Sequence, residues 1–279
     1  MSASEPPIGT DLRVITEPTV YVLGRQIIDD IELDRFLGDH GVSWESDSEI
    51  AAEVATETAG RVCYMSFAKP RPGGNAAYLH HIKEVGHGSV LEHAVWNLLF
   101  TGVSRSLTHE LVRHRAGMGY SQLSQRYVDE SVAEYVEPDI IAADPELHEL
   151  WLDAVTHVHA AYVKLAEKLN AKLADPQAAA AAMIPPGADR TTRRKAARQA
   201  ARSVLPNATE TKIFVTANAR ALRHFLEQRG SAHAEPEIRK LACKVLDVLQ
   251  KESPNLFGDY EKLPLPDGTF EVTTQFKKV

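Results

Sequence analysis

The chain has 279 residues, of which 44% are hydrophobic and 25% are charged. This is the balance of an ordinary globular protein, and it excludes wholesale disorder, collagen and fibrous repeats. The 31 Lys and Arg residues against 38 Asp and Glu give a net charge of -7, which argues against a surface that coats nucleic acid. A chain with this charge binds an anion only where its arginines gather locally.

The cysteine content and the hydropathy of the chain further limit the class of protein to which it can belong. Two cysteines, Cys63 and Cys243, make neither a disulfide framework nor a metal knuckle, and Cys63 is expected to be buried in its apolar VCYMSF context. The N-terminus lacks the basic start and apolar run of a signal peptide. No apolar stretch reaches the roughly 18–20 residues of a membrane span. We therefore expect a cytoplasmic protein with no membrane partner, in which residues 1–12 form a flexible arm.

Hydrophobic patterning predicts the elements of the first half of the chain. Strands are expected where β-branched and aromatic residues cluster, and helices where small and apolar residues recur at helical spacing. The expected elements are strands over 13–23, broken near Pro18, and over 94–103, with helices over 48–63, 75–85 and 104–115.

The second half of the chain is dominated by predicted helices. Asp144-Pro145-Glu146 is typical of a helix start, with an N-cap acceptor, a preset φ and an acid in the first turn. A long amphipathic helix to about Leu173 carries a stripe of apolar side chains, Leu147, Leu150, Trp151, Val155, Val158, Tyr162, Leu165 and Leu169. Beyond it we expect a flexible connection over 174–189, a basic helix over 191–205, a strand over 212–216, and helices over 218–228 and 236–251.

Strands are few in this pattern and are separated by long helices. A repeating βαβ fold is therefore disfavoured. We expect an α+β fold in which residues 1–279 form a single catalytic domain, with a central, mostly antiparallel sheet flanked by long helices.

The most unusual segment covers residues 110–127, which read ELVRHRAGMGYSQLSQRY. Its neighbouring cations cannot share one helix face, because successive residues point about 100° apart. One interpretation is a basic helix end, favoured by the helix dipole, followed by a turn at Gly117 and Gly119. The other is an anion-binding corner, since arginine forks, loop N–H groups and the hydroxyls of Ser121 and Ser124 all bind phosphate. The carboxamide of Gln122 would suit a nucleotide.

A second cluster, GHGSVLEH over 86–93, raises the question of a metal, as does the pair His109-Glu110. A zinc helix of the His-Glu-x-x-His type places two imidazoles on one face at i and i+4. The fourth place after His109 is Arg113, and His114 lies at i+5, about 140° away. A cation in the ligand position argues against bound metal, so none is expected.

A third cluster runs from Arg202 to His233. Arg220 and His224 share a helix face at i and i+4, and Arg229, placed between a helix end and a glycine, is a candidate for contact with a ligand. The stripe formed by Arg194 and Arg198 is expected to be a solvated face. The chain has no G-x-S-x-G elbow, no phosphate loop of the Walker type and no G-x-G-x-x-G opening a helix.

Taken together, these segments resemble the flavin-dependent thymidylate synthases, the ThyX family. The hallmark of that family is Arg-His-Arg, seven residues and then Ser, and here Arg113-His114-Arg115 precedes Ser124. The match extends to GHGSVLEH before it and to ARSVLP, NARALRHFLEQR and HAEPEI after it, in consistent order over about residues 50–250. The resemblance implies methylation of dUMP at uracil C5 to give dTMP, with methylenetetrahydrofolate as methylene donor and NADPH as reductant. It also implies non-covalent FAD and a homotetramer whose active sites draw on several subunits.

The resemblance further implies roles for individual residues. Arg229 stands at the position that stabilises the ionised uracil at its N3/O4 edge and so moves electron density to C5. Contacts to FAD are implied for His87, Ser89, Arg113, His114, Arg115, Gln122, Asn218, Arg220, His224 and His233. Contacts to the nucleotide are implied for Glu110, Arg113, Gln122, Leu123, Ser124, Gln125, Arg126, Arg202 and Arg229, with Ser124 holding the nucleotide rather than attacking it.

Two departures from the family pattern keep alternatives open. Eight residues, AGMGYSQL, separate Arg115 from Ser124, one more than the family spacing, and His224 stands where Asn is common. A displaced loop could relieve crowding at the 2′ position and admit UMP, alone or with dUMP, for modified-nucleoside biosynthesis. Two further hypotheses are a polynucleotide-binding module built on the basic helix 190–202, and a family member that binds flavin without turnover.

Overall fold

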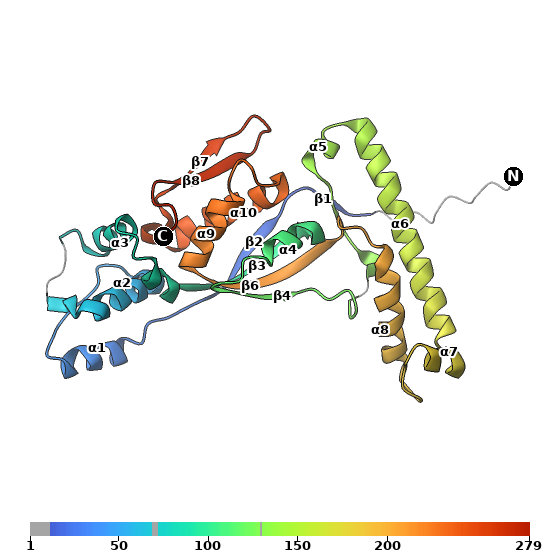
Figure 1. The fold of residues 1–279 in the computed structure, drawn as a ribbon, viewed down its shortest axis with the longest axis horizontal. Helices are drawn as coiled ribbons and strands as arrows, with labels where there is room; N and C mark the ends of the chain where they lie inside the picture. The colour runs from blue at the N-terminus through green and yellow to red at the C-terminus, as the bar shows by residue number, and fades with distance from the viewer. Residues whose placement is uncertain (1–11, 69–71, 129) are drawn as a thin grey trace. The chain divides into compact units, whose positions relative to one another are not determined.

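The computed structural model describes residues 12–68, 72–128 and 130–279, and it has a mixed helix-and-sheet fold (Figure 1). The expected α+β class is therefore confirmed. The chain divides into two compact units. Of the described residues, the first contains those from Leu12 to Glu17 together with Gly102–Thr108 and Gln122–Lys212, and the second contains those of Pro18–Thr101, His109–Ser121 and Ile213–Val279. The expected single catalytic domain over 1–279 stays a prediction, and all of the expected arm 1–12 except Leu12 lies outside the described residues.

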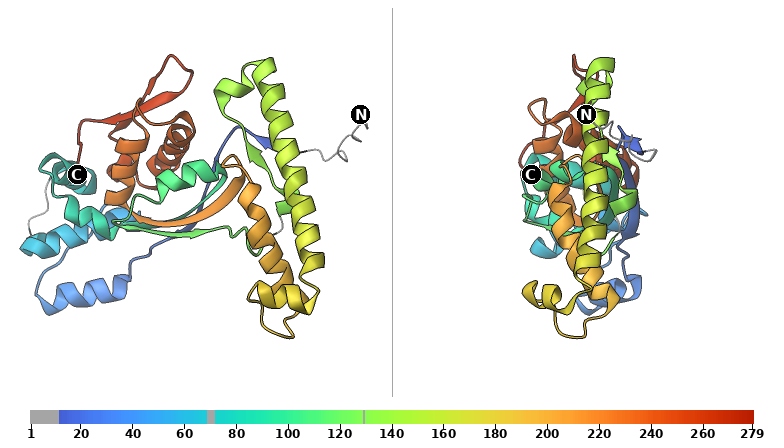
Figure 2. Two further views of the ribbon diagram at one scale, coloured as in Figure 1. Left: turned by 45° about the vertical axis from the view of Figure 1, so that its right-hand side comes forward. Right: turned by 90° about the vertical axis from the view of Figure 1, so that its right-hand side faces the viewer.

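The first unit is mainly helical. Its elements are β1 (Val14–Ile15), β5 (Tyr135–Val136), α5 (Asp139–Ala142), α6 (Pro145–Lys172), α7 (Pro176–Ala181) and α8 (Arg190–Ala201), with short 3-10 helices at Glu130–Val132 and Arg202–Val204. Strands β1 and β5 pair in parallel. Helices α6 and α8 lie side by side in both views of Figure 2, and the short helix α4 (Arg105–Leu111) begins in this unit.

The predicted start of the long helix α6 is confirmed. Asp144 accepts hydrogen bonds from the backbone N–H groups of Glu146 and Leu147, at 2.9 and 3.3 Å. Val155 and Tyr162 are buried, but other members of the predicted apolar stripe are not, since Leu147 and Leu150 are 43% and 68% exposed. Periodicity therefore identified the residues that share a face without identifying what covers them.

The segment 174–189, expected to be a flexible connection, contains helix α7. Asp175 caps this helix by accepting a hydrogen bond from Ala178 N at 2.9 Å, and Pro176 occupies its first turn. The alanines that follow have the highest helix propensity of any residue, which accounts for a helix where the sequence analysis expected none.

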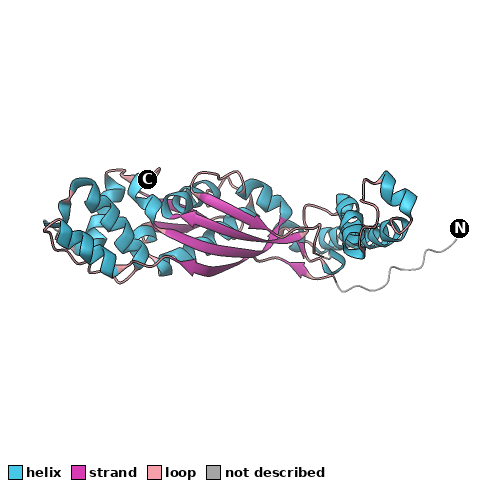
Figure 3. Ribbon diagram, turned by 90° about the horizontal axis from the view of Figure 1, so that it is seen from below, coloured by secondary structure: helices cyan, strands magenta, loops and turns pink. Residues whose placement is uncertain are grey.

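The second unit holds most of a four-stranded sheet with strand order β2-β3-β6-β4, whose strands are seen side by side in Figure 3. The strands are β2 (Thr19–Arg25), β3 (Val95–Ser104), β4 (Met118–Gln122) and β6 (Glu210–Asn218). The β2–β3 pair is antiparallel. Strands β4 and β6 also run in opposite directions, because Gly117 bonds to Asn218 at one end and Leu123 to Lys212 at the other.

The second unit also contains most of the helices outside the first. They are α1 (Asp30–Asp39), α2 (Ala51–Tyr64), α3 (Gly74–Glu84), α9 (Ala219–Arg229), α10 (Pro236–Glu252) and α11 (Pro254–Phe257), with 3-10 helices at Ser66–Ala68 and Gly88–His93 and a hairpin of β7 (Tyr260–Pro264) and β8 (Phe270–Thr274). The predicted elements over 48–63, 75–85, 94–103, 218–228 and 236–251 are all confirmed, with ends that differ by at most three residues. Helix α10 packs on β2, α9 and β8 through its predicted apolar face, where Ile238, Leu241 and Val245 are buried.

Several expectations are wrong. The helix expected over 104–115 ends at Leu111, and the following segment forms strand β4, which the polar and glycine-rich letters MGYSQ did not reveal. Helix α1 and the C-terminal hairpin were also not predicted. Cys63 is exposed rather than buried, because the buried face of α2 ends at Arg61 and the last turn of the helix extends beyond the core.

A buried ionic cluster joins α3, α9 and the C-terminal hairpin of the second unit. Both Nη atoms of Arg223, a fully buried side chain, donate to the Asp259 carboxylate at 2.9 Å. Lys83 donates to the same carboxylate at 2.6 Å, and so does Thr274 at 2.5 Å. Burial alone would raise the pKa of Asp259, but the hydrogen bonds and charges of Arg223 and Lys83 outweigh it and lower the pKa to about 2.

We predict that Asp259→Asn strongly destabilises the fold. It leaves two buried cations without their partner, and removing one member of a buried ion pair costs about 3–5 kcal/mol. The matched control is Asp247→Asn, since Asp247 pairs with Lys262 at 2.6 Å and is about half exposed, so its loss should cost less than about 1 kcal/mol.

Urea unfolding of the two variants measures this difference. The contribution of Asp259 is fully present above its unfolded pKa of about 3.9 and is lost as the pH falls through about 2. Equal and small losses of stability in the two variants would contradict the prediction.

Candidate functional site

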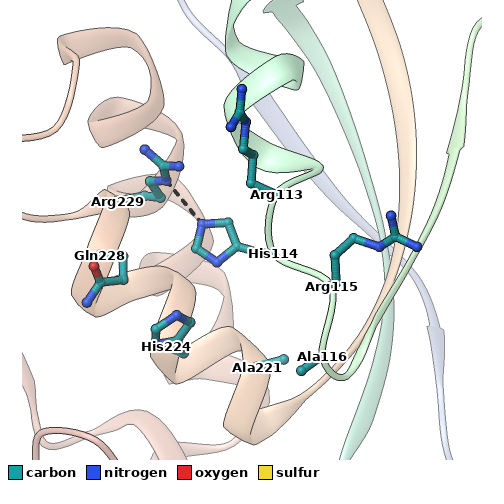
Figure 4. Close-up of a pocket in the computed structure, with 8 residues that line it drawn as sticks. All are labelled: Arg113, His114, Arg115, Ala116, Ala221, His224, Gln228 and Arg229. Carbon is teal, nitrogen blue, oxygen red and sulfur yellow. Dashed lines mark hydrogen bonds between the residues drawn. The ribbon is translucent and has the colours of Figure 1, made fainter.

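A cavity of about 520 Å³ in the second unit is built from the loop after α4 and from one face of α9. It is lined by Arg113, His114, Arg115, Ala116, Ala221, His224, Gln228 and Arg229 (Figure 4). Three of these eight side chains are Arg, in a chain whose net charge is negative. This is the local concentration of cations that binding an anion requires.

A close backbone contact fixes the loop against the start of α9. Asn218 caps α9 by accepting a hydrogen bond from Ala221 N at 2.9 Å, and its own N–H donates to Gly117 O at 3.1 Å. Gly117 has a φ of +69°, and a Cβ atom there would lie 2.7 Å from Asn218 Nδ2. Only glycine fits at this point, so the predicted turn at Gly117 is also the place where the two walls of the cavity meet.

Arg229 is held by two acceptors inside the first cavity. Its Nε donates to His114 Nε2 at 3.0 Å, as Figure 4 shows, and its guanidinium also pairs with the side chain and carbonyl oxygen of Glu110. Burial lowers the pKa of His114 to about 4, with help from the charges of Arg229 and His224. His114 is therefore neutral near pH 7, and Nε2 can accept the hydrogen bond.

Glu110 is the charged partner of Arg229. Burial and the nearby Glu235 raise the pKa of Glu110, while Arg229 lowers it, and the net shift is upward. The protein thus stabilises the carboxylate less than the charge of Arg229 alone would.

Tyr120 of β4 secures the loop that carries the Arg-His-Arg segment. Its hydroxyl lies 2.7 Å from His114 O and 3.0 Å from Leu111 O. Burial raises the pKa of Tyr120 to about 12, although Arg115 opposes the shift, so the hydroxyl remains a donor at physiological pH. The position of His114 is therefore set from its backbone as well as from its ring.

A second cavity of about 350 Å³ adjoins the first and shares Ala116, Ala221 and His224 with it. It is also lined by Glu92, Gly117, Asn218, Arg220, Glu227, Lys278 and Val279. Arg220 pairs with Glu92 at 2.6 Å, and both side chains are about half exposed. The two cavities together bring six predicted cofactor residues into one region, Arg113, His114, Arg115, Asn218, Arg220 and His224.

Four predicted cofactor residues do not line either cavity. His87 and Ser89 are exposed at the start of the 3-10 helix Gly88–His93, and His233 is exposed in the turn between α9 and α10. The fourth, Gln122, belongs to the first unit, where its Nε2 donates to Thr108 Oγ1 at 3.1 Å and to Thr211 Oγ1 at 3.3 Å.

The remaining predicted nucleotide contacts lie in the first unit. They are Leu123, Ser124, Gln125, Arg126 and Arg202. Ser124 Oγ accepts a long hydrogen bond from Arg126 N at 3.4 Å. Gln125 Nε2 and Arg126 Nε are both buried without a hydrogen-bond partner among the described residues. A buried donor without an acceptor is costly, and the described residues supply none for these two atoms.

The sequence analysis missed Arg105, which lies in the same unit and near the predicted nucleotide contact Arg202. Burial and the charge of Arg202 lower the pKa of Arg105, while Glu130 opposes them, and within the described part of the chain its Nη1 is buried without a partner. The available signal was its position as the first residue of α4. A cation at the positive end of a helix is unfavourable and therefore calls for a reason.

The described residues contain no group of three or more His, Cys, Asp or Glu side chains that could hold a metal ion. None of the helices in the same part of the chain is long and apolar enough to cross a membrane.

Comparison with known proteins gives consistent matches over most of the chain. Residues 47–255 match the Thy1 family, described as thymidylate synthase complementing protein. A flavin-dependent thymidylate synthase of Mycobacterium sp. (strain JLS) is 52% identical over 235 residues, which is 84% of this chain and 89% of the relative. One from Corynebacterium diphtheriae is 44% identical over 260 residues, covering 91% and 98%.

Solved structures agree at the level of the fold. A UMP/dUMP methylase, PolB of Streptomyces cacaoi bound with 5-Br dUMP, superposes with a TM-score of 0.58 at 20% identity and covers 88% of this chain and 96% of its own. The family match spans the Arg-His-Arg loop and all of α9, the two elements that form the first cavity. The chain belongs to the Thy1 family of thymidylate synthase complementing proteins.

Proposed function

We propose that this protein is a flavin-dependent thymidylate synthase that methylates dUMP at C5 to form dTMP. The carbon comes from methylenetetrahydrofolate. FAD, when bound and reduced, supplies the hydride that converts the transferred methylene to a methyl group. NADPH is the source of the electrons that reduce the flavin. The observation that carries the proposal is the first cavity, in which Arg229 is held by a neutral His114 and the Glu110 carboxylate. The names of relatives with about half of their residues identical support it.

The residues around the two cavities fit a non-covalent flavin nucleotide. Arg113, Arg115 and Arg220 provide cations for a diphosphate. The rings of His114 and His224 meet edge to face, with centroids 5.5 Å apart, and offer flat surfaces to an aromatic ligand. The close approach of Gly117 to Asn218 shapes the wall of the second cavity.

Arg229 is proposed to activate the uracil. C5 of uracil is a poor nucleophile, and a cation at the N3/O4 edge stabilises the negative charge that must develop there before C5 can attack. Arg229 can exchange the Glu110 carboxylate for this edge of the base, while His114 keeps the guanidinium in place through Nε. No side chain needs to form a covalent bond to the substrate in this scheme.

The first unit is proposed to hold the nucleotide phosphate. The buried donors Gln125 Nε2, Arg126 Nε and Arg105 Nη1 call for an acceptor, and a phosphate offers several acceptor oxygens with matching charge. Arg202 lies near Arg105 and adds a further cation. Gln122 to Ser124 are proposed to orient the sugar and base.

We also propose a cytoplasmic homotetramer with active sites shared between subunits, bound to folate and nucleotide but not to nucleic acid. The exposed side chains Leu147, Leu150 and Leu165 on α6 support an assembly, because large exposed apolar groups along one helix mark an interaction surface.

Methylation of UMP, alone or with dUMP, is the second candidate. The extra residue between Arg115 and Ser124 favours it, because the longer segment includes Gly117 and strand β4 beside the first cavity. The structural neighbour from Streptomyces cacaoi is named a UMP/dUMP methylase, and it shares the fold.

The visible spectrum of the purified protein tests the substrate assignment. We expect bound flavin bands that change when dUMP is added, because the nucleotide would stack beside the flavin. An equal change with UMP would favour the second candidate. A protein that stays colourless after incubation with FAD would contradict the flavoenzyme proposal, and binding of polynucleotide that weakens steeply with salt would favour the nucleic-acid alternative.

We predict that Arg229→Ala retains flavin and loses most turnover, by about 10²–10³-fold, the usual cost of removing one group that stabilises a developing negative charge. The matched control is Arg194→Ala, an exposed arginine of α8. Initial rates and flavin absorbance measure the two effects. A near-normal rate and nucleotide affinity in Arg229→Ala would remove this residue from the chemistry, and flavin binding without any turnover in the wild type would favour the inactive-relative hypothesis.

Ser124→Ala is expected to keep measurable activity, because the hydroxyl only holds the nucleotide. Losing one hydrogen bond to a charged group costs about 1.5–3 kcal/mol, which should appear mainly as a higher KM for dUMP. Steady-state kinetics provide the measurement. Complete loss of turnover with intact dUMP binding would instead indicate a serine nucleophile.

A further inference from the structure

The last residues of the chain, Phe276–Val279, form what we call the C-terminal strap, which follows β8 in the second unit. Arg223 Nη2 donates to Phe276 O at 3.1 Å, and Phe276 N donates to Thr274 Oγ1 at 3.0 Å. The Phe276 ring packs edge to face on His80, with centroids 5.0 Å apart, and lies 5.6 Å from Lys83 Nζ. The strap is thus attached to the buried cluster around Asp259.

The strap continues to the edge of the second cavity and is fixed there. The backbone N–H of Lys278 lies 3.1 and 3.2 Å from the two carboxylate oxygens of Glu227. Lys278 has a φ of +63°, which turns the chain sharply. Val279 is 5% exposed and packs so closely on Gly88 that a Cβ there would lie 2.6 Å from Val279 C. Lys278 is therefore placed at the cavity by contacts on both sides.

The charge of the Lys278 side chain determines whether the side chains that line the second cavity repel an anion. The acidic side chains that line the second cavity are Glu92 and Glu227, and the basic ones are Arg220 and Lys278, so their formal charges cancel. Without Lys278 the same lining would carry a formal charge of −1, since two carboxylates would then face one guanidinium. A lining of that sign would repel a diphosphate.

We propose that the C-terminal strap is part of the cofactor site, and that the Lys278 ammonium binds the diphosphate of the flavin dinucleotide together with Arg220. This inference rests on the proposed function, and it names a cofactor-binding residue on a segment that the sequence analysis left without a role. Arg220 is already paired with Glu92 at 2.6 Å, so a second cation is needed to offset the repulsion that the two carboxylates of the lining exert on a phosphate. An exposed lysine ammonium is a suitable point charge for that purpose.

The experiment compares neighbouring lysines in the full-length protein. The variants are Lys278→Ala, Lys278→Glu and Lys278→Arg, and the matched control is Lys277→Ala, since Lys277 is also exposed but does not line the cavity. Dissociation constants for FAD and for riboflavin are measured by flavin fluorescence on protein freed of flavin. Circular dichroism establishes that each variant is folded.

Lys278→Ala should weaken FAD binding about tenfold, the worth of one charge-assisted hydrogen bond. Lys278→Glu should weaken it further, Lys278→Arg should restore it, and Lys277→Ala should change it less than about twofold. Riboflavin affinity should be the same in all variants, because riboflavin carries no phosphate.

Two results would overturn the inference while leaving the flavoenzyme proposal intact. One is an FAD affinity in Lys278→Ala that equals that of Lys277→Ala. The other is an equal loss of FAD and riboflavin binding in Lys278→Ala, which would reduce the strap to a structural support. A wild-type protein that binds neither flavin would overturn the proposed function and this inference together.

Discussion

The buried ion pair between Arg223 and Asp259 determines where helix α9 lies, and with it the site. Arg223 is fully buried, while Arg220, His224 and Arg229 of the same helix line the cavities. Because Asp259 also accepts hydrogen bonds from α3 and β8, one carboxylate positions three elements at once. The helix that presents the cations is thus held by a buried charge pair that does not line either cavity.

The arginines that line the cavities of the second unit have acceptors of different kinds. Arg229 has a neutral imidazole and a carboxylate whose pKa is raised, and Arg220 has an exposed carboxylate. This arrangement keeps the guanidinium groups in place. It also explains how a chain with an excess of acidic residues maintains a local site for anions.

Local sequence signals predicted most elements of this fold, because caps and periodicity act over a few residues. Asp144 and the apolar face of α10 are examples. Strand β4 was missed because its pairing with β6 comes from residues about 90 positions away, which no local pattern encodes. For the same reason the residues alone left the Arg-His-Arg segment open between a helix end and an anion site. The family resemblance predicted that the Arg-His-Arg segment and helix α9 form one site. The contact between Gly117 and Asn218 is the physical reason why the two segments lie together.

The exposure of Cys63 has a practical consequence. The only other cysteine, Cys243, is buried, and burial raises the pKa of its thiol, so little of the reactive thiolate forms there. A maleimide dye would therefore modify the native chain at a single position, near the end of α2. Cys63 can therefore be labelled with a fluorescent reporter in the unmodified sequence. Motions of the second unit can then be followed without removing or adding a cysteine.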